Sequence, residues 1–356
     1  MNLTLHLTEN CNMACSYCLR EKTSKDMTME VLHRACDLAF SKGNKAGLCF
    51  FGGEPLLRKD LIYEALDYCE KKSLETGIPF GCKMTTNGTL LDEAFLKRAK
   101  EADMGIGISF DGKGQDISRR FPDGSSTAAL LEEKAKLLLT YRPNALAMLT
   151  LDPKAANLLS ESVKYLVSIG FRNISTVIAY GRRVNWTDDD MEILRAEHNK
   201  IADFLKEEFI KGNRIYVSPL ISKIKECIAG KNPAEHCHLG VRQMPVTPNG
   251  NLFPCTSFID DEDYRMGDVF NGIDDKKVAE IAKRSNTPET CTNCDLKTRC
   301  TNSCGCSNRM NTGSENKVSP LQCTYERMVI EIADRLGEEL YQYDPKAFME
   351  AFSRSK

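Results

Sequence analysis

Three cysteines near the start of the chain have the residue type and the spacing of metal ligands. Cys11, Cys15 and Cys18 lie in the run CNMACSYC, which follows a short apolar segment at residues 3–7. Iron–sulfur cubanes are usually held by four cysteine thiolates, so three converging thiolates would leave one iron open to another ligand. A zinc site with a distant fourth ligand, or three buried thiols, is the alternative, but zinc sites usually pair C-x2-C units. The spacing therefore favours an iron–sulfur cluster that binds a small molecule and passes an electron to it.

This cysteine spacing resembles the signature of the radical S-adenosylmethionine (radical SAM) enzymes. A second apolar segment, residues 47–51, leads into Gly52-Gly53-Glu54-Pro55, and a GGEP turn at this place belongs to the same family pattern. The resemblance implies that the open iron binds SAM, which one electron cleaves to a 5′-deoxyadenosyl radical that takes hydrogen from the substrate. It also implies that Gly52, Gly53 and Glu54 position the SAM amino group, since glycine lets a backbone approach a ligand closely.

The resemblance assigns SAM contacts to further side chains near the strand ends. Tyr17, next to Cys18, would lie against the adenine, and Ser109 would contact the ribose or the carboxylate. An arginine after the fourth strand would meet the SAM carboxylate. Arg119 or Arg120 is the candidate, and Arg119 is the one that we predict.

Two other motifs at strand ends would by default be simple turns. Thr86-Asn87-Gly88 follows the third predicted strand, and Asp111-Gly112 follows the fourth. The family often carries a TNG turn and a serine before Asp-Gly at these places, so the resemblance gives both motifs more weight.

A second group of cysteines lies in the last third of the chain. The run PVTPNGNLFPC predicts a hairpin with a two-residue turn at Asn249-Gly250, which would bring Cys255 back toward Cys237. The pattern resembles the SPASM module, a C-terminal extension of radical SAM enzymes that modify peptides and proteins. The resemblance implies two auxiliary four-iron clusters, and so three [4Fe-4S] clusters in all. Seven cysteines are the predicted ligands: Cys237, Cys255, Cys291, Cys294, Cys300, Cys304 and Cys323.

The resemblance also implies how these seven cysteines divide between the clusters. The outer cluster would take four of them: Cys291, Cys294, Cys300 and Cys323. The inner cluster would take the other three: Cys237, Cys255 and Cys304. A zinc ribbon is the alternative for the module, because C-x2-C units suit tetrahedral zinc.

The inner cluster has no obvious fourth ligand in the sequence. Cys306, His236 and His238 are the candidates. An iron left open for a substrate thiolate is the remaining possibility.

One position argues against sulfatase maturation. Anaerobic sulfatase-maturing enzymes place an aspartate, the proposed base, directly after the second SPASM cysteine, and this chain has Thr256 there. A threonine hydroxyl is a poor general base at neutral pH, unlike a carboxylate within hydrogen-bonding reach. Asp260, Asp261 or a barrel residue could take that role.

The elements that must position these residues follow a regular alternation over the first 180 residues, typical of βα units around a parallel sheet. Strands are predicted near residues 3–7, 47–51, 79–85, 105–110, 145–151 and 173–179. Six such units predict an α/β fold, a partial (β/α)6 TIM-like barrel, followed by a small cysteine-rich α+β SPASM module. Function gathers at the carboxyl ends of parallel barrel strands. The N-terminal cysteine loop, the GGEP turn, Thr86-Asn87-Gly88 and the run from Ser109 to Gly112 all fall there.

We expect the chain to have four parts. They are a radical SAM partial barrel at 1–186, a bridging helical region at 187–230, a SPASM auxiliary-cluster domain at 231–335 and a C-terminal helical tail at 336–356.

Composition narrows the class of protein. A net charge of −2 with 28% charged residues implies no nucleic-acid partner. No window approaches the ~18 apolar residues of a membrane span, and the N-terminus lacks a signal-peptide pattern. Sixteen cysteines in such a chain favour a reducing, low-oxygen cytoplasm over a disulfide framework.

These features together predict a radical SAM/SPASM enzyme that acts on a peptide or protein. Maturation of a ribosomally made peptide, by thioether or other side-chain crosslinks, is the first choice. A dehydrogenase of an alcohol or thiol, including formylglycine formation on sulfatases, is the alternative enzyme, and an iron–sulfur or zinc scaffold is the non-catalytic alternative. Because the cluster motif begins at residue 11, we expect either a separate leader-recognition protein or direct binding of the substrate by the barrel and the SPASM module. A flavodoxin- or ferredoxin-type electron donor is also expected.

Overall fold

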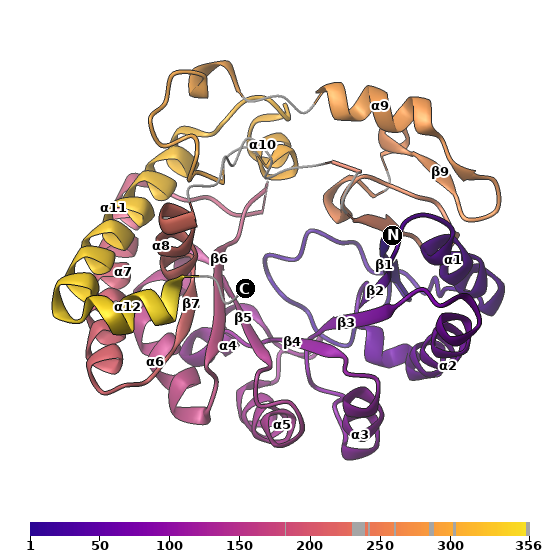
Figure 1. Cartoon of the computed structure of the whole chain (residues 1–356), viewed down its shortest axis with the longest axis horizontal. Helices are drawn as coiled ribbons and strands as arrows, with labels where there is room; N and C mark the ends of the chain where they lie inside the picture. Colours follow the sequence, from indigo (N-terminus) through magenta and orange to yellow (C-terminus); the bar gives the residue numbers. More distant parts are fainter. Residues whose placement is uncertain are drawn as a thin grey trace.

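A curved parallel sheet of eight strands forms the centre of the fold, with the order β7-β6-β5-β4-β3-β2-β1-β8 (Figure 1). The computed structural model describes residues 1–181, 183–229, 239–240, 243–259, 261–284, 288–301 and 304–353. The strands of this sheet are β1 (Asn2–His6), β2 (Ala46–Phe51), β3 (Phe80–Thr86), β4 (Gly105–Ser109), β5 (Leu146–Leu151), β6 (Asn173–Ile178), β7 (Tyr216–Ser218) and β8 (Met244–Val246). The six predicted strands are β1 to β6, so the predicted partial barrel is confirmed.

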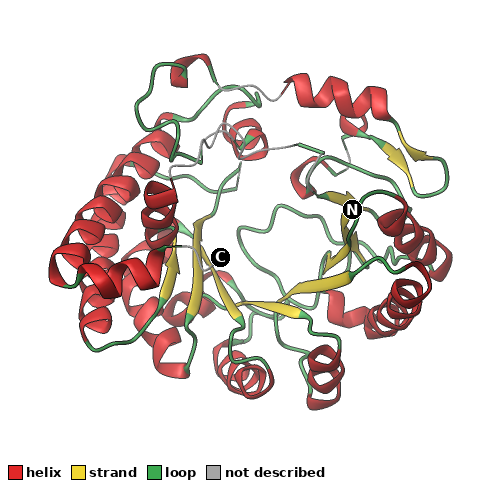
Figure 2. Cartoon of the chain, viewed as in Figure 1, coloured by secondary structure: helices red, strands yellow, loops and turns green. Residues whose placement is uncertain are grey.

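Helices cover the outer side of the arc that the sheet makes (Figure 2). Strands of a parallel sheet are buried on both faces and are therefore rich in apolar residues. In β1 and β2, Leu3 pairs with Leu48 and Leu5 pairs with Phe50, and all four side chains are buried. Their apolar side chains therefore form part of the core beneath the strand ends.

Some of the helices begin at polar residues that cap their first turn. Thr28 accepts a hydrogen bond from Val31 N, and Asp92 accepts one from Phe95 N. The α-helices are α1 (Met29–Ser41), α2 (Lys59–Thr76), α3 (Glu93–Glu101), α4 (Gln115–Ser118), α5 (Ala128–Tyr141), α6 (Leu159–Ile169), α7 (Asp188–Ile210), α8 (Leu220–Ala229), α9 (Asp275–Arg284), α10 (Gly305–Thr312), α11 (Pro320–Tyr343) and α12 (Pro345–Phe352). Short 3-10 helices are η1 (Pro55–Arg58), η2 (Gly112–Gly114), η3 (Pro153–Leu158), η5 (Thr256–Phe258), η6 (Glu262–Tyr264) and η7 (Glu289–Cys291). In the described ranges, no helix has the length and apolar character needed to cross a membrane.

Segments beyond residue 186 complete both edges of the sheet. β7, from the bridging region, pairs with β6, and β8, from the cysteine-rich region, pairs with β1. The C-terminal helix α11 runs unbroken through residue 335, so the predicted boundary at 335/336 lies inside one helix. The C-terminal region therefore joins the barrel through the sheet itself.

The predicted hairpin before Cys255 is present, but its turn differs from the prediction. Thr247 N donates to Asn251 O at 3.0 Å, and Gly250 N donates to Thr247 O at 2.9 Å. The loop thus has three residues instead of the two predicted, with Gly250 at φ +86° in the left-handed region. A two-residue turn at Asn249-Gly250 was wrong because Pro248 also belongs to the loop. A separate two-stranded antiparallel sheet follows, formed by β9 (Gly267–Asp268) and β10 (Gly272–Ile273).

The cysteine-rich segment that carries α9 and α10 lies across the open side of the arc, opposite β3 and β4 (Figure 1). The end of β6 and α10 meet at one cavity, which both Ile178 and Met310 line.

Candidate active site

The three N-terminal cysteines lie in the loop between β1 and α1, at the carboxyl end of β1. All three thiols are half-buried. Two backbone hydrogen bonds hold this loop against the segment after β4: Ala14 N donates to Arg120 O at 2.7 Å, and Ser16 N donates to Ser118 O at 2.9 Å. The segment that follows β4 therefore holds the cysteine loop in place, in addition to β1, from which the loop starts.

Burial and two nearby N–H donors act on these thiols in opposite directions. Burial raises the pKa of the Cys15 thiol, the Arg119 guanidinium lowers it, and negative charge on Cys11 or Cys18 would raise it. Arg119 Nη1 lies 3.8 Å from Cys15 Sγ, and Asn87 Nδ2 lies 3.8 Å from Cys11 Sγ. Hydrogen bonds to cluster sulfurs tune such sites. Three thiols within electrostatic reach of one another, with two N–H donors directed at them, fit an iron–sulfur cluster.

Gly52 and Gly53 fasten the cysteine loop to the end of β2. Gly53 N donates to Thr8 O at 2.8 Å, and Glu54 N donates to Asn10 O at 2.9 Å. A Cβ on Gly53 would lie 2.0 Å from Asn10 O, and a Cβ on Gly52, at φ +127°, would lie 2.5 Å from Thr8 O. Glycine is thus required for the close approach of two backbone segments. The contact of these glycines with the SAM amino group stays a prediction.

The Glu54 carboxylate is fully buried and joins the ends of β2 and β3. Its Oε1 accepts hydrogen bonds from Thr86 Oγ1 at 2.6 Å and Leu56 N at 3.0 Å. Its Oε2 accepts one from Asn87 N at 2.7 Å. Burial raises the pKa of Glu54, and these hydrogen bonds oppose the shift. Glu54 therefore orients the turn whose Asn87 side chain reaches Cys11, and its role toward SAM stays a prediction.

Asp111, which the sequence predicts by default as a turn residue, lies at the centre of a buried network. Its Oδ2 accepts hydrogen bonds from Tyr17 OH at 2.9 Å and Arg119 Nε at 3.0 Å, and its Oδ1 accepts one from Thr150 N at 2.9 Å. Burial raises the pKa of Asp111, and Arg119 lowers it. The Arg119 guanidinium also lies 5.4 Å from the centre of the Tyr17 ring. The position of Asp111 at a strand end was the one signal of this role in the sequence.

The two candidate arginines differ in burial and in hydrogen-bond partners. The Arg119 side chain is 9% exposed and pairs with Asp111, whereas Arg120 is exposed and donates to Gly124 O at 3.0 Å. Arg119 is therefore the arginine beside the cysteine loop, and its contact with the SAM carboxylate stays a prediction. Ser109 ends β4 and is half-buried, and its contact with SAM stays a prediction.

The predicted ligands of the outer auxiliary cluster gather around one arginine. Arg327 Nη2 lies 3.6 Å from Cys294 Sγ. A hydrogen bond to Cys323 is the main cause that raises the pKa of Arg327, and the charges of Cys294 and Cys300 add to it. Cys294 N donates to Cys291 O at 3.2 Å, which makes a tight turn between these two cysteines. The structure thus places the four predicted outer ligands in one neighbourhood.

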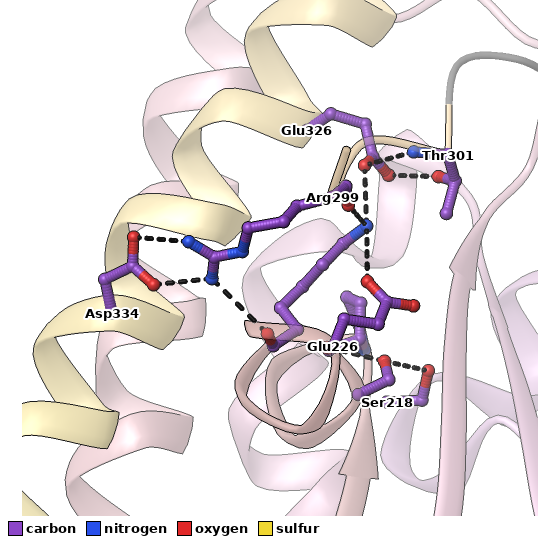
Figure 3. A network of polar contacts seen from close by, with 9 residues as sticks. Ser218, Glu226, Arg299, Thr301, Glu326 and Asp334 are labelled. Carbon is purple, nitrogen blue, oxygen red and sulfur yellow. Dashed lines mark hydrogen bonds and ion pairs between the residues drawn. The ribbon is translucent and has the colours of Figure 1, made fainter. Parts of the chain in front are cut away.

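A buried polar network holds the segment that carries Cys300 (Figure 3). The Lys223 side chain of α8 is 1% exposed, and its ammonium lies 3.1 Å from Glu326 Oε2 and also binds Arg299 O. Glu326 accepts hydrogen bonds from Thr301 N at 3.0 Å and Thr301 Oγ1 at 2.6 Å. The residues on both sides of Cys300 are therefore bound to the same ion pair.

Arg299 extends this network to α11 (Figure 3). Its guanidinium binds both oxygens of Asp334, at 2.9 Å and 2.5 Å, and donates to Lys223 O at 3.3 Å. Because Asp334 lies on α11, whose first turn carries Cys323, these contacts fix the Cys300 segment relative to Cys323.

Three further thiols meet at the start of α10. Cys306 Sγ lies 3.1 Å from Cys304 Sγ, and the Cys306 thiol also contacts Cys255 through a hydrogen bond. Tyr180 lies beside them. Burial raises the pKa of its hydroxyl, and the charges of these three thiols raise it further. Two predicted inner ligands and one candidate ligand are thus in contact.

Four residues named in the sequence predictions lie outside the described residues: Cys237, His236, His238 and Asp260. Within the part of the chain that the structure describes, no three His, Cys, Asp or Glu side chains are placed to share one bare metal ion. Thiolates that hold an iron–sulfur cubane bind separate irons and need not converge on a single point.

A cavity of about 590 Å³ lies between the mouth of the barrel and the C-terminal module. It is lined from both sides, by Tyr17, Cys18 and Thr150 and by Thr256, Ile259 and Met310. Glu21 is the carboxylate among the described lining residues, whereas Asp261 is ion-paired with Arg309 at 2.5 Å. The cavity thus reaches from the N-terminal cysteine loop to Thr256, the residue directly after Cys255.

The sequence is similar to those of radical SAM proteins. Residues 5–148 match the sequence model of the radical SAM superfamily. An uncharacterized protein of Methanocaldococcus jannaschii is 32% identical over 176 residues, and this match covers 49% of the chain and 61% of that protein. A cysteine-type anaerobic sulfatase-maturating enzyme of Clostridium perfringens is 23% identical over 282 residues, which cover 74% of the chain and 75% of the enzyme.

Solved structures share the fold along the whole chain. A structure of His6-tagged anSMEcpe with bound AdoMet superposes with a TM-score of 0.82 at 20% identity, covering 100% of this chain and 99% of that one. Streptococcus suis SuiB bound to its precursor peptide SuiA superposes with a TM-score of 0.65 at 15% identity, covering 90% of this chain and 75% of SuiB. The barrel and the cysteine-rich C-terminal region therefore occur together in known structures.

Proposed function

Since this chain is a radical SAM enzyme with the fold of anSMEcpe, we propose that it activates a C–H bond of a peptide or protein. The observation that carries this proposal is the cavity of about 590 Å³, because it joins the N-terminal cysteine loop to the C-terminal module. A peptide segment bound there would have one side chain near SAM and the rest of its length against the module.

The residues of the barrel mouth would hold the cofactors. When bound, SAM and the cluster held by Cys11, Cys15 and Cys18 supply a 5′-deoxyadenosyl radical that takes a hydrogen atom from the substrate. The buried Arg119 would offer its charge to the SAM carboxylate, and Tyr17 would lie against the adenine. Both side chains donate a hydrogen bond to the Asp111 carboxylate, which keeps them in place.

Ser109 and the two glycines complete the proposed SAM site. Ser109 would contact the ribose or the carboxylate of SAM, at the end of β4. Gly52 and Gly53 let the backbone at the end of β2 pack closely on the cysteine loop, which would set that backbone beside the SAM amino group. Glu54 would act by holding this backbone in position, since its buried oxygens accept three hydrogen bonds.

The C-terminal module would hold two auxiliary four-iron clusters, which with the first make three. The grouping of the four outer cysteines near Arg327 supports the outer cluster. The proximity of Cys255 and Cys304, each of which contacts Cys306, supports the inner one. These clusters would either take up the electron left on the substrate after hydrogen abstraction or bind the substrate.

Maturation of a ribosomally made peptide by crosslinking is the reaction that we propose first. Thr256 takes the place of a carboxylate in the cavity wall, and a hydroxyl is a poor base. The shared fold with SuiB, solved with its precursor peptide, supports a peptide substrate.

Formylglycine formation on a sulfatase is the second candidate. The sequence similarity to a cysteine-type sulfatase-maturating enzyme and the full-length fold match favour it. It requires a base at the cavity, where Glu21 is the carboxylate among the described lining residues.

One mass-spectrometric experiment separates the two reactions. The reconstituted enzyme receives SAM, a flavodoxin- or ferredoxin-type donor and either precursor peptides from neighbouring genes or a sulfatase peptide with the target cysteine. A crosslink appears as a product lighter by two hydrogens that does not react with a carbonyl-specific hydrazide, whereas formylglycine reacts with it. Cys15→Ala is the matched control for chemistry that does not depend on SAM. Formation of neither product, with 5′-deoxyadenosine still released, would contradict the proposal of a peptide substrate.

A further inference from the structure

We propose that Arg327 raises the reduction potential of the outer auxiliary cluster and so favours that cluster as an electron acceptor. This inference rests on the auxiliary clusters of the proposed function. The four predicted ligands of the outer cluster, Cys291, Cys294, Cys300 and Cys323, all lie within the described residues. Four cysteines leave no iron of a cubane open, so this cluster is suited to electron transfer and not to binding the substrate.

The contacts of the Arg327 guanidinium carry the inference. Its Nη2 lies 3.6 Å from Cys294 Sγ, and a hydrogen bond joins the guanidinium to the Cys323 thiol. Cys323 and Arg327 are four residues apart in α11, so their side chains lie on the same face of the helix. The guanidinium therefore spans from its own helix to the loop of Cys294 and directs N–H groups at two of the four predicted ligands.

No carboxylate neutralises Arg327 in the part of the chain that the structure describes. Glu331, one turn further along α11, pairs with Arg195 at 3.0 Å instead. The other described arginines beyond Cys255 each pair with at least one carboxylate: Arg265, Arg284, Arg299, Arg309 and Arg335. Arg327 differs from all of them, because its charge faces thiols.

A positive charge beside an iron–sulfur cluster favours the reduced form of the cluster. A cubane held by four thiolates is an anion, and a further electron makes it more negative, so its attraction to a guanidinium grows on reduction. Hydrogen bonds to the ligand sulfurs also set the potential. The Arg327 side chain is exposed, so water and salt screen part of this attraction and the expected shift is moderate.

A higher potential would suit the outer cluster to the electron-accepting role. In both candidate reactions the substrate radical loses one electron and one proton as the product bond forms. The electron would reduce the oxidised outer cluster, and the proton would go to solvent.

Arg335, on the same helix, is the natural comparison for Arg327. It binds Glu339 at 2.9 Å and Asp203 at 3.2 Å. Eight residues at about 1.5 Å each place it about 12 Å further along the helix axis, which exceeds the Debye length of about 8 Å at physiological ionic strength. Removing Arg335 therefore removes the same charge at a distance where most of its effect on the cluster is screened.

A redox titration of the full-length chain, without SAM and without peptide, tests the proposal. The background carries Cys11→Ala, Cys15→Ala and Cys18→Ala, which remove the SAM-binding cluster, and it should load about eight irons. Electron paramagnetic resonance at controlled potentials gives the midpoint potential of each auxiliary cluster. Adding Cys291→Ala and Cys294→Ala removes the outer cluster and so identifies its signal.

We expect Arg327→Gln to make reduction of the outer cluster about tenfold less favourable, which for one electron is a midpoint about 59 mV more negative. Arg327→Lys keeps the charge but lacks the planar fork that reaches two thiols, so its midpoint should lie between the two. Arg335→Gln, the matched control, should keep the reduction equilibrium within about twofold of the background. An Arg327→Gln equilibrium within about twofold of the background, or an equal shift in Arg335→Gln, overturns the proposal.

The lysine variant covers the case in which Arg327→Gln does not hold the outer cluster, seen as about four irons fewer than the background. A more negative midpoint in Arg327→Lys then supports the proposal, whereas an unchanged midpoint or loss of the cluster overturns it. If Cys291→Ala and Cys294→Ala together remove no iron, no outer cluster forms and the proposal is overturned as well. Failure of the proposed reaction is measured separately, as missing peptide product in the unaltered enzyme.

Discussion

The two groups of cysteines in this molecule are held in place by different means. The N-terminal group occupies one loop, and backbone hydrogen bonds attach that loop to the ends of neighbouring parallel strands. The C-terminal group comes from a hairpin, several short turns and the first turns of two helices. Its segments are joined by a buried ion-pair network and by contacts between thiols.

This difference shows which parts of a site depend on local sequence. Parallel strand ends form a regular platform, so a short motif placed on that platform is sufficient to gather ligands. Where regular structure is sparse, buried charges must orient the ligand-bearing segments, and each such contact involves residues far apart in the chain.

The largest expected effect separates the chemistry of the two groups. Cys15→Ala should lower the rate of 5′-deoxyadenosine formation by at least ~1,000-fold, or about 4 kcal/mol in the barrier, because a ligand of the SAM-binding cluster is lost. Cys294→Ala should keep SAM cleavage within about tenfold of the unaltered rate while peptide product is lost. Chromatography of 5′-deoxyadenosine and mass analysis of the peptide measure both. Cleavage at the normal rate in Cys15→Ala would show that the cluster assignment is wrong.

Removing the lysine of the buried network tests how the C-terminal group is held. Lys223→Met should lower the free energy of unfolding by about 3 kcal/mol, because the Glu326 carboxylate stays buried without its cation. Urea unfolding of the reconstituted protein measures the change. Lys225→Met, on the exposed side of the same helix, is the matched control and should stay within about 0.5 kcal/mol. Equal effects of the two changes would contradict the role of the network.

The two adjacent arginines test the arrangement at the barrel mouth. Arg119→Gln should weaken SAM binding by about 30-fold, or about 2 kcal/mol, because a buried charge that faces the proposed SAM carboxylate is lost. Arg119→Lys keeps the charge and should lose less affinity. The exposed Arg120→Gln is the control and should bind SAM as the unaltered protein does. Calorimetry with SAM measures all three, and similar losses at both arginines would refute the assignment.

The smallest expected effect concerns the contact between α7 and α11. Burial lowers the pKa of His198 to about 4, and the Leu194 carbonyl and the Glu197 charge oppose this shift. In the unfolded chain a histidine has a pKa of about 6.5, so the unfolded state takes up the proton first as the pH falls. The folded state should therefore lose about 1 kcal/mol from this group between about pH 7 and pH 5.5.

Urea unfolding at the two pH values measures this loss. His198→Gln should reduce it by about 1 kcal/mol, since the group that takes up the proton is gone. Burial also lowers the pKa of His6 to about 3, so the comparison between the unaltered protein and the variant isolates His198. An identical pH dependence in both proteins would contradict the prediction.

Much of the barrel could be predicted from the sequence because its signals are local. The six strands β1 to β6 follow from apolar segments that alternate with helical patterns, and the cysteine loop and the GGEP turn fall at their ends. The hairpin before Cys255 was predicted from Asn249-Gly250, but its loop is one residue longer. A difference of one residue in a turn depends on hydrogen bonds that the sequence pattern does not specify.

Other features could not be predicted because they depend on contacts between distant segments. Short apolar runs gave no sign that β7 and β8 complete the two edges of the barrel sheet. Nothing in the sequence around Lys223 indicates that its side chain is buried against Glu326 and the Arg299 carbonyl.

The sequence by itself determined the type of chemistry and the barrel that supports it, because cysteine spacing, glycine turns and strand periodicity act over a few residues. Only the tertiary structure buried Arg119 while it left Arg120 exposed, joined Tyr17 to Asp111 by a hydrogen bond and brought Cys306 against Cys255. Adjacent residues can point to opposite environments, and residues far apart can meet. The environment of a residue and its distant contacts both depend on how the chain packs, and a short sequence motif does not specify that packing.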